Sequence, residues 1–289
     1  MTNHAVPQSC IPSTVGGAVA AQHLLGSVIR QTRPGIESQS PIDRAYDALK
    51  AITSVSYTLH SSWTHQHGSM LAAATVAAVE DYFRTIFVEI AMICPFAIER
   101  ANRLETRVLF VETGSREQAL RSTLELVSFS SADNIDDWCN KLVGQKASKD
   151  RSLSSLMTDF SSVFHLRHCI THAGGYVSVN NSNALRADPG TWVSVDSAQN
   201  IDQIVAIVTR LLRSFNQWLF AQVLGRWITD SRLAGDWQVD QTLFKPLWKA
   251  FSSNVDIRAG AASGQNVVPK NSYLAYLAIR GAVRSRQSA

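Results

Sequence analysis

The chain lacks the features that mark membrane-embedded and secreted proteins. No apolar run approaches the roughly 18 residues that suggest a membrane-spanning helix, and Pro95 interrupts the longest one, at residues 90–97. The N-terminus, Met1–His4, has neither the basic start nor the apolar core of a signal peptide. We therefore expect a cytoplasmic protein that does not associate with membranes.

Cysteine pairs and cofactor-binding motifs are missing as well. The sequence contains no Walker loop, no dinucleotide fingerprint and no Ser-elbow motif. The cysteines are widely spaced and form no Cys-x-x-Cys pair, which indicates small buried thiols rather than disulfides or a zinc site. They are Cys10, Cys94, Cys139 and Cys169. We expect no cofactor and no bound metal ion.

Lysine is scarce, and acidic residues are missing from the C-terminal end. Lysine supplies 7 of the 27 basic residues and arginine the other 20; arginine is the better matched of the two to bidentate phosphate contact. After Asp256 the chain carries five basic residues and no acid. That segment is therefore +5 in a chain of net charge +4, which leaves −1 for the first 256 residues. We interpret residues 231–289 as a basic C-terminal extension.

Most of the chain shows the apolar spacing of α-helices, with recognisable helix ends. Ser40–Pro41 is typical of a helix start, because proline is favoured at the first helical position. Pro95 ends or kinks the helix expected from about residue 69. Ser115 and Gln118 form a capping-box pattern that opens another helix. A further helix is expected near residues 135–143, ended by Gly144, and others near residues 158–173, 201–227, 243–251 and 273–283.

One stretch departs from the helical pattern. Residues 176–179 and 192–195 alternate apolar and polar side chains, and the asparagine-rich run 180–183 lies between them, so we expect a small β-hairpin. Residues 1–39 are rich in Ser, Thr, Gly, Gln and Pro and are expected to be a mobile arm. The fold class is then mainly α, with a helical domain over residues 40–230 that carries the hairpin as an insertion.

The run Leu-Arg-His-Cys-Ile-Thr-His-Ala-Gly-Gly at residues 166–175 places an arginine and a histidine at the end of an expected helix. Arg167 offers a permanently charged fork for phosphate, and His172 can move a proton near neutral pH. The glycine pair predicts the helix end, where the helix dipole favours the charged form of His172. Taken alone, such a pair is more often a solvated charge beside a capping histidine. The largely apolar helix that carries it favours chemistry.

The spacing of the basic residues in this run permits two interpretations. Five residues on a helix correspond to roughly 140° of rotation, so Arg167 must bend toward the last turn to reach His172. His165, His168 and His172 line one stripe, which is a possible metal-ligand pattern. No acidic residue lies nearby in the sequence to complete a catalytic metal shell. We therefore favour metal-free chemistry.

At these residues the chain resembles the HEPN superfamily (higher eukaryote and prokaryote nucleotide-binding domains), and within it the RiboL-PSP-HEPN type. The family motif is an arginine, a polar residue that is often asparagine, a few variable residues and a histidine. Arg167, His168 and His172 stand at those places, with histidine in the polar position. The similarity continues in residues 173–176 and in the alanine-rich helix 72–83, and it covers about residues 40–225. The implied fold is a HEPN-type helical bundle.

The resemblance also implies an activity and partners. The activity is metal-independent endoribonucleolytic cleavage that leaves a 2′,3′-cyclic phosphate, in a bacterial defence or toxin system. Arg167 would hold the phosphate, His172 would transfer a proton and His168 would assist. Glu80 and Asp81 are expected to orient Arg167 from a neighbouring helix. The implied partners are RNA, a second copy of the chain that shares the cleft, and an antitoxin or sensor protein.

Other interpretations stay open. The same residues fit a catalytically silent HEPN-like module that binds nucleotide or RNA and a partner protein, or an all-helical interaction domain with no role in nucleic-acid binding. Two other clusters favour structural roles. We expect His60, His65 and His67 in a loop between the first two helices. We expect four tryptophans mostly in the core or at an interface, namely Trp218, Trp227, Trp237 and Trp248.

Overall fold

The computed structural model describes residues 39–103, 115–262 and 268–287, so the expected N-terminal arm lies almost entirely outside the described residues. The described part is helical and contains no sheet. Its α-helices are α2 (Pro41–Thr58), α3 (His65–Ile93), α4 (Pro95–Ala101), α5 (Arg116–Glu125), α6 (Ala132–Val143), α7 (Arg151–His172), α8 (Val179–Leu185), α9 (Ala198–Thr229), α10 (Trp237–Phe251), α11 (Asn254–Ala262) and α12 (Ser272–Gln287).

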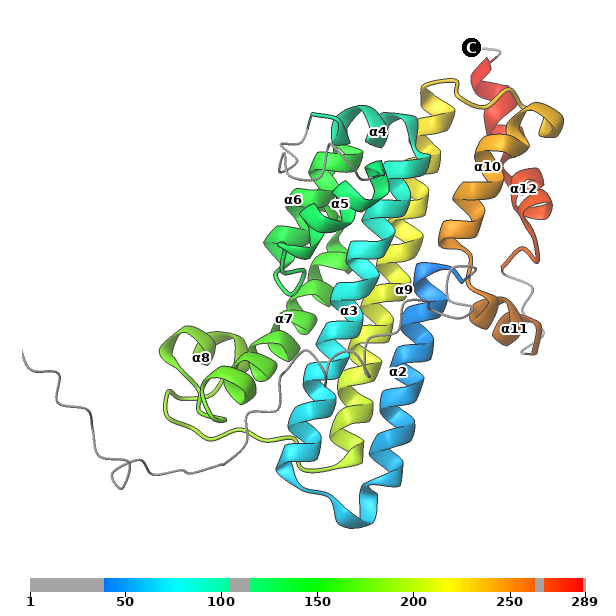
Figure 1. Ribbon diagram of the computed structural model, residues 1–289. Helices are drawn as coiled ribbons and strands as arrows, with labels where there is room; N and C mark the ends of the chain where they lie inside the picture. The colour runs from blue at the N-terminus through cyan, green and yellow to red at the C-terminus, as the bar shows by residue number, and fades with distance from the viewer. Residues whose placement is uncertain (1–38, 104–114, 263–267, 288–289) are drawn as a thin grey trace, which may run out of the picture. The chain divides into compact units, whose positions relative to one another are not determined.

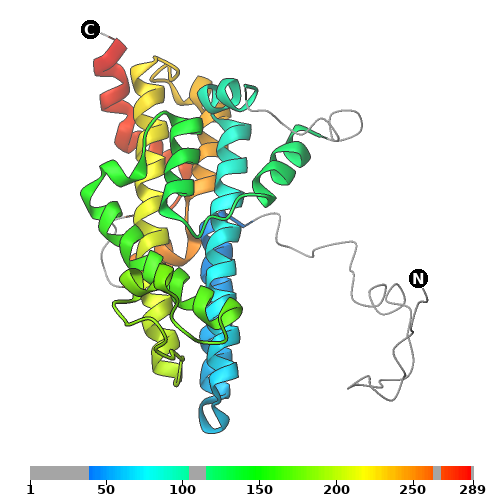
Figure 2. The same ribbon diagram turned by 90° about the vertical axis from the view of Figure 1, so that its left-hand side faces the viewer.

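Helix α3 is the central element of the bundle. Figures 1 and 2 show α2 and α9 running beside it, and α7 packs against both α3 and α9. Its middle turns are buried on most sides: seven of the twelve residues from Val79 to Ile90 are apolar and buried, and Thr85 is buried with them. A helix that buries most of its circumference needs neighbours on several sides. Among the described helices, seven contact α3, namely α2, α4, α5, α6, α7, α9 and α10.

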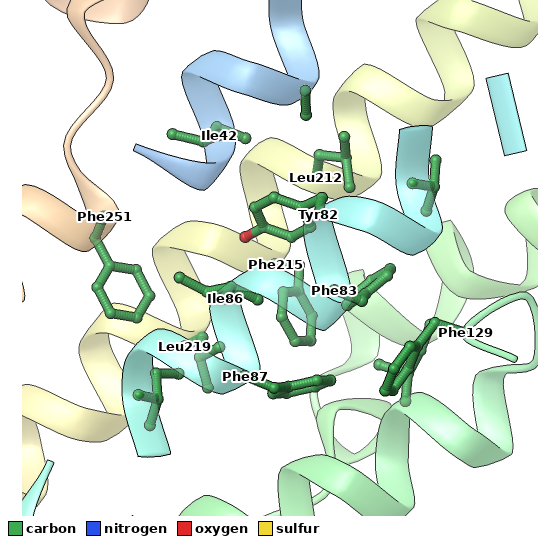
Figure 3. Packing of buried hydrophobic residues seen from close by; sticks show 14 of the residues in the cluster. Ile42, Tyr82, Phe83, Ile86, Phe87, Phe129, Leu212, Phe215, Leu219 and Phe251 are labelled. Atoms are coloured by element: carbon green, nitrogen blue, oxygen red, sulfur yellow. The ribbon is translucent and has the colours of Figure 1, made fainter. Parts of the chain in front are cut away.

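The core around α3 is aromatic (Figure 3). The ring of Phe83 lies edge-on to Phe215 of α9, with ring centroids 4.8 Å apart, and 6.1 Å from Phe87 one turn later. Phe87 in turn lies 5.3 Å from Phe129, in the segment between α5 and α6. Edge-to-face and offset contacts of this kind are favourable beyond the area they bury. They join α3, α9 and the α5–α6 connection in one cluster.

The C-terminal helices belong to the same compact unit as the bundle. The buried carboxylate of Asp43 on α2 accepts hydrogen bonds from Ser253 Oγ at 2.7 Å and from the backbone N–H of Asn254 at 2.9 Å. Asp240 on α10 accepts a bond from Tyr276 Oη of α12 at 2.6 Å. The basic residues that follow Asp256 are exposed on the surface. These are Arg258, Lys270, Arg280, Arg284 and Arg286.

Several helix ends expected from the sequence are confirmed. Ser40 caps α2 by accepting a bond from the Asp43 N–H, with Pro41 at the first helical position. Ser115 and Gln118 form the reciprocal capping box of α5. Gly144 ends α6 in a left-handed conformation. Three cysteines, Cys94, Cys139 and Cys169, are buried free thiols, and Trp227 is fully buried in the core. No described helix is long and apolar enough to cross a membrane.

Three helices begin clearly earlier than expected, because a capping side chain precedes each start. Helix α10 begins at Trp237 instead of residue 243, since Asp236 accepts a bond from the Gln238 N–H. Helix α3 begins at His65, since Thr64 Oγ1 accepts from the His67 N–H while His67 Nδ1 accepts from the Thr64 N–H. The expected loop around His65 and His67 is therefore wrong. Helix α7 begins at Arg151 instead of residue 158, because Asp150 accepts bonds from the N–H groups of its first turn.

The expected β-hairpin is also wrong. One antiparallel bridge, Tyr176 to Trp192, joins the two stretches, and the asparagine-rich run between them folds as α8. Asn181 of that helix is buried against α7, where its amide bonds to two side chains. Burial of a polar group costs free energy unless the group is hydrogen-bonded, and Asn181 has such partners. Contacts with another helix therefore decide the conformation of a run whose composition favours a turn.

Truncation of a buried leucine should lower the free energy of unfolding much more than truncation of an exposed leucine. We expect Leu219→Ala, in the fully buried cluster of Figure 3, to lower the free energy of unfolding by about 2–5 kcal/mol. Leu126→Ala, at a side chain that is 67% exposed, should change it by less than about 0.5 kcal/mol. Urea unfolding followed by circular dichroism measures both. Equal losses would contradict the packing described here.

Candidate functional site

The candidate site lies at the C-terminal end of α7. The apolar side of α7 is buried in the bundle, and its last turns carry His165, Arg167, His168 and His172. The helix closes at Ala173, as expected, and Gly174 and Gly175 follow with φ angles of 59° and 90°. These angles lie in the left-handed region that glycine adopts without strain.

The structure brings Arg167 and His172 together. A guanidinium nitrogen of Arg167 lies 3.2 Å from Nε2 of His172, so the long arginine side chain does bend to the last turn. Arginine can only donate a hydrogen bond, so Nε2 must accept it. In this arrangement the imidazole is neutral, with its proton on Nδ1. The charged form of His172 that the helix dipole favours would not make this contact.

His168 lies beside the pair. Its ring centroid is 5.0 Å from that of His172 and 6.3 Å from that of Phe164. The pKa of His168 is lowered from its ordinary value, first because partial burial penalises the charged form, and then because His172, His165 and Arg167 place positive charge nearby. His168 therefore favours its neutral, proton-accepting form.

His165 is held by a residue from α8. Its Nδ1 lies 2.8 Å from Oδ1 of Asn181, and the amide nitrogen of Asn181 donates to Cys169 Sγ at 3.2 Å. Because the amide oxygen must accept, Nδ1 of His165 carries a proton. Figure 1 shows α8 beside the end of α7. The sequence pattern indicates neither Asn181 nor this contact, since the composition of the run 180–183 is typical of a turn.

The two carboxylates expected to orient Arg167 have other partners. Glu80 accepts a bond from Ser128 Oγ at 2.9 Å and forms an ion pair with Arg84 at 3.5 Å. Asp81 is paired with Arg44 at 2.7 Å. Neither contacts Arg167, whose hydrogen bond goes to His172.

The positive charge at the end of α7 is not compensated by nearby acids of the sequence. No Asp or Glu occurs between Asp159 and Asp188, a stretch that holds Arg167, Arg186 and three histidines. No ion pair of Arg167 occurs with any residue that the structure describes. Within the same residues no three His, Cys, Asp or Glu side chains converge as metal ligands, so the stripe formed by His165, His168 and His172 is not a preformed metal site. The arrangement is suited to an anion.

No family model, curated protein or solved structure matches the chain. The chemistry of the site therefore has to be argued from the side chains at the end of α7. They offer one permanent cation, two adjacent imidazoles and a third imidazole whose tautomer is fixed by a buried amide. Such groups can bind a phosphate and move protons.

The lowered pKa of His168 should depend on its neighbour. In the parent chain the pKa of His168 should lie below the ordinary value of about 6.5. His172→Gln removes the neighbouring imidazole and should raise it toward that value, while the contribution of burial remains. Proton NMR titration of the ring C–H signal measures the change. Thr171→Ala, at an exposed neighbour, is the control and should leave it unaltered. An unchanged His168 pKa in His172→Gln would contradict the stated cause.

Proposed function

We propose that this protein is a metal-independent endoribonuclease of HEPN type, and that Arg167, His168 and His172 carry the reaction. The observation that carries the proposal is the contact of Arg167 with His172 at 3.2 Å, with the His168 ring directly beside it. The contact joins the first and last positions of the motif that resembles HEPN ribonucleases. It supports the proposal further because the guanidinium and the two imidazoles lie within reach of one anion.

The side chains match the three requirements of RNA cleavage. The 2′-hydroxyl must lose a proton as its oxygen attacks phosphorus, the pentavalent phosphate must be stabilised, and the departing 5′-oxygen must gain a proton. A neutral imidazole is the base for the first step, and the lowered pKa of His168 and the acceptor Nε2 of His172 both suit that role. The guanidinium of Arg167 stabilises the phosphate. The products are a 2′,3′-cyclic phosphate and a 5′-hydroxyl.

One motif supplies a single arginine and one pair of adjacent imidazoles, which is a small set of groups for the three requirements of the reaction. A two-fold dimer would bring two motifs to one cleft and provide a separate acid and base. We therefore extend the proposal to a homodimer in which both copies of the α7 end face each other. A role in a bacterial defence or toxin system, with an antitoxin or sensor that holds the cleft closed, follows from the same resemblance.

Cleavage should not need a metal ion. Purified protein in excess EDTA should cut single-stranded RNA, and an oligonucleotide with 2′-deoxyribose throughout should resist. Arg167→Ala and His172→Ala should each slow cutting by about 100-fold or more, because one removes charge stabilisation and the other a proton-transfer group. His168→Ala should be milder. Rates come from gel separation of end-labelled products.

Matched substitutions control for folding and for general charge. Arg151→Ala removes an exposed arginine from the opposite end of α7, and His60→Ala removes an exposed histidine from the connection before α3; neither should change the rate. RNA binding without cutting, indifferent to Arg167 and His172, would favour the silent module instead. Cutting that EDTA abolishes would contradict metal independence.

The dimer should be required for activity. Sedimentation equilibrium at micromolar concentration should give twice the chain mass of 31.7 kDa. Inactive Arg167→Ala and His172→Ala chains, once mixed, should regain part of the activity, because a mixed cleft again holds one arginine and one histidine. A monomer that cuts RNA, or mixtures that stay inactive although they exchange subunits, would contradict a shared cleft.

A further inference from the structure

An exposed aromatic pair lies directly after the motif helix. Tyr176 and Trp192 face each other across the single antiparallel bridge, and their side chains are 56% and 48% exposed. Residues paired across such a bridge project to the same face. No described residue accepts a hydrogen bond from the indole N–H of Trp192 or the hydroxyl of Tyr176. Aromatic side chains with an apolar ring and an unengaged polar atom at the surface are suited to contact with a ligand.

The position of Trp192 is tied to the end of the motif. A Cβ atom on Gly175 would lie 2.5 Å from the indole Nε1, so only glycine permits this approach. The Val193 N–H also donates to the Gly175 carbonyl at 2.8 Å. Gly175 follows His172 by three residues, which limits the distance between their Cα atoms to about 11 Å. The indole is therefore about one or two nucleotides from the proposed reaction centre.

A hollow of about 400 Å³ opens beside Trp192. Its other walls are the first turns of α3, with His65, Gln66 and Met70, and the residue Ile170 of α7. The ring of His65 lies edge-on to the indole, with centroids 5.7 Å apart. Apolar walls with a few polar groups, at a volume within the roughly 300–1,000 Å³ of small-molecule sites, suit a planar heterocycle. Gln66 offers an amide to its polar edge.

We infer that Trp192 binds an unpaired nucleobase of the RNA, next to the phosphate that Arg167 contacts. The inference rests on the proposed ribonuclease function and adds a substrate class to it: single-stranded RNA, because the bases of a duplex are not free to leave their stack. Stacking on an aromatic ring tolerates any base. Tyr176, on the same face, is the adjacent platform.

Binding of a 12-nucleotide fluorescein-labelled RNA of mixed sequence tests the inference. The parent for every arm is the His172→Ala chain, which prevents cutting, and fluorescence polarisation at fixed salt gives Kd. Trp192→Ala should weaken binding roughly tenfold. Trp192→Phe should recover most of the loss and Trp192→Leu should not, because leucine keeps apolar packing without a π face. Tyr273→Ala, at a 45% exposed side chain of α12, is the matched control and should bind normally.

Further arms separate this inference from its rivals. The salt dependence of Kd should stay unchanged in Trp192→Ala, since the number of phosphate contacts is the same, and the RNA annealed to its complement should not respond to Trp192. Equal binding by Trp192→Ala and its parent, with cutting intact in the wild-type chain, would overturn the base site alone. Absence of both RNA binding and cutting would overturn the proposed function with it.

Two other occupants of the hollow would also overturn the inference. If AMP quenches the fluorescence of Trp192 with a Kd as low as that of the 12-nucleotide RNA, the hollow is a mononucleotide site. A Trp192→Ala chain that changes its sedimentation mass while keeping its RNA affinity would make the aromatic pair an interface between copies. Thermal melting of each variant, followed by circular dichroism, confirms that the fold is intact before either comparison.

Discussion

Burial of α3 on most sides is the constraint on which the rest of the structure depends. A helix with Val79, Phe83 and Ile86 fully buried on successive turns has to be enclosed, and α2, α7 and α9 enclose it lengthwise. Polar atoms inside this core are hydrogen-bonded, and the hydroxyl of Tyr82 donates to Asn216 of α9 at 3.0 Å. The amide of Asn216 then bonds to the Phe251 carbonyl of α10 at 2.8 Å. The position of α7, and so of its last turn, follows from this enclosure.

The end of α7 gathers basic side chains. Three imidazoles and a guanidinium lie where no carboxylate contacts Arg167, and partial burial, followed by the charge of these neighbours, lowers the pKa of His168. An acidic side chain beside Arg167 would stabilise the fold, as Asp81 does beside Arg44. Uncompensated charge at a helix end is most simply relieved by an anionic ligand. This physical reason supports an anionic ligand, independently of the resemblance to HEPN ribonucleases.

The sequence was sufficient for features that local chemistry decides. Apolar spacing predicted the long helices, and Ser40, Ser115 and Gly144 marked real helix ends, because a cap depends on a few adjacent residues. Features decided by distant contacts were not predictable. The asparagine-rich run became α8 because Asn181 bonds to His165 and Cys169 of another helix. The contact between Arg167 and His172 was expected from the motif, because both residues lie on one helix. The partners of Glu80 and Asp81 were not, because they depend on how α2, α3 and the α5–α6 connection meet.

The contact between Arg167 and His172 exists only while His172 is neutral, since a protonated Nε2 cannot accept a hydrogen bond. Protonation would replace an attraction by a repulsion between two cations and free both groups for a phosphate. A bound phosphate would favour that proton in return, because linkage between two ligands is reciprocal. In the proposed reaction, substrate would therefore help to create the acid that the leaving 5′-oxygen requires. A neutral His168 with a lowered pKa would remain beside it as the base. The positive charge gathered at this helix end would thus give the two imidazoles different protonation states in the complex, with His172 as the acid and His168 as the base.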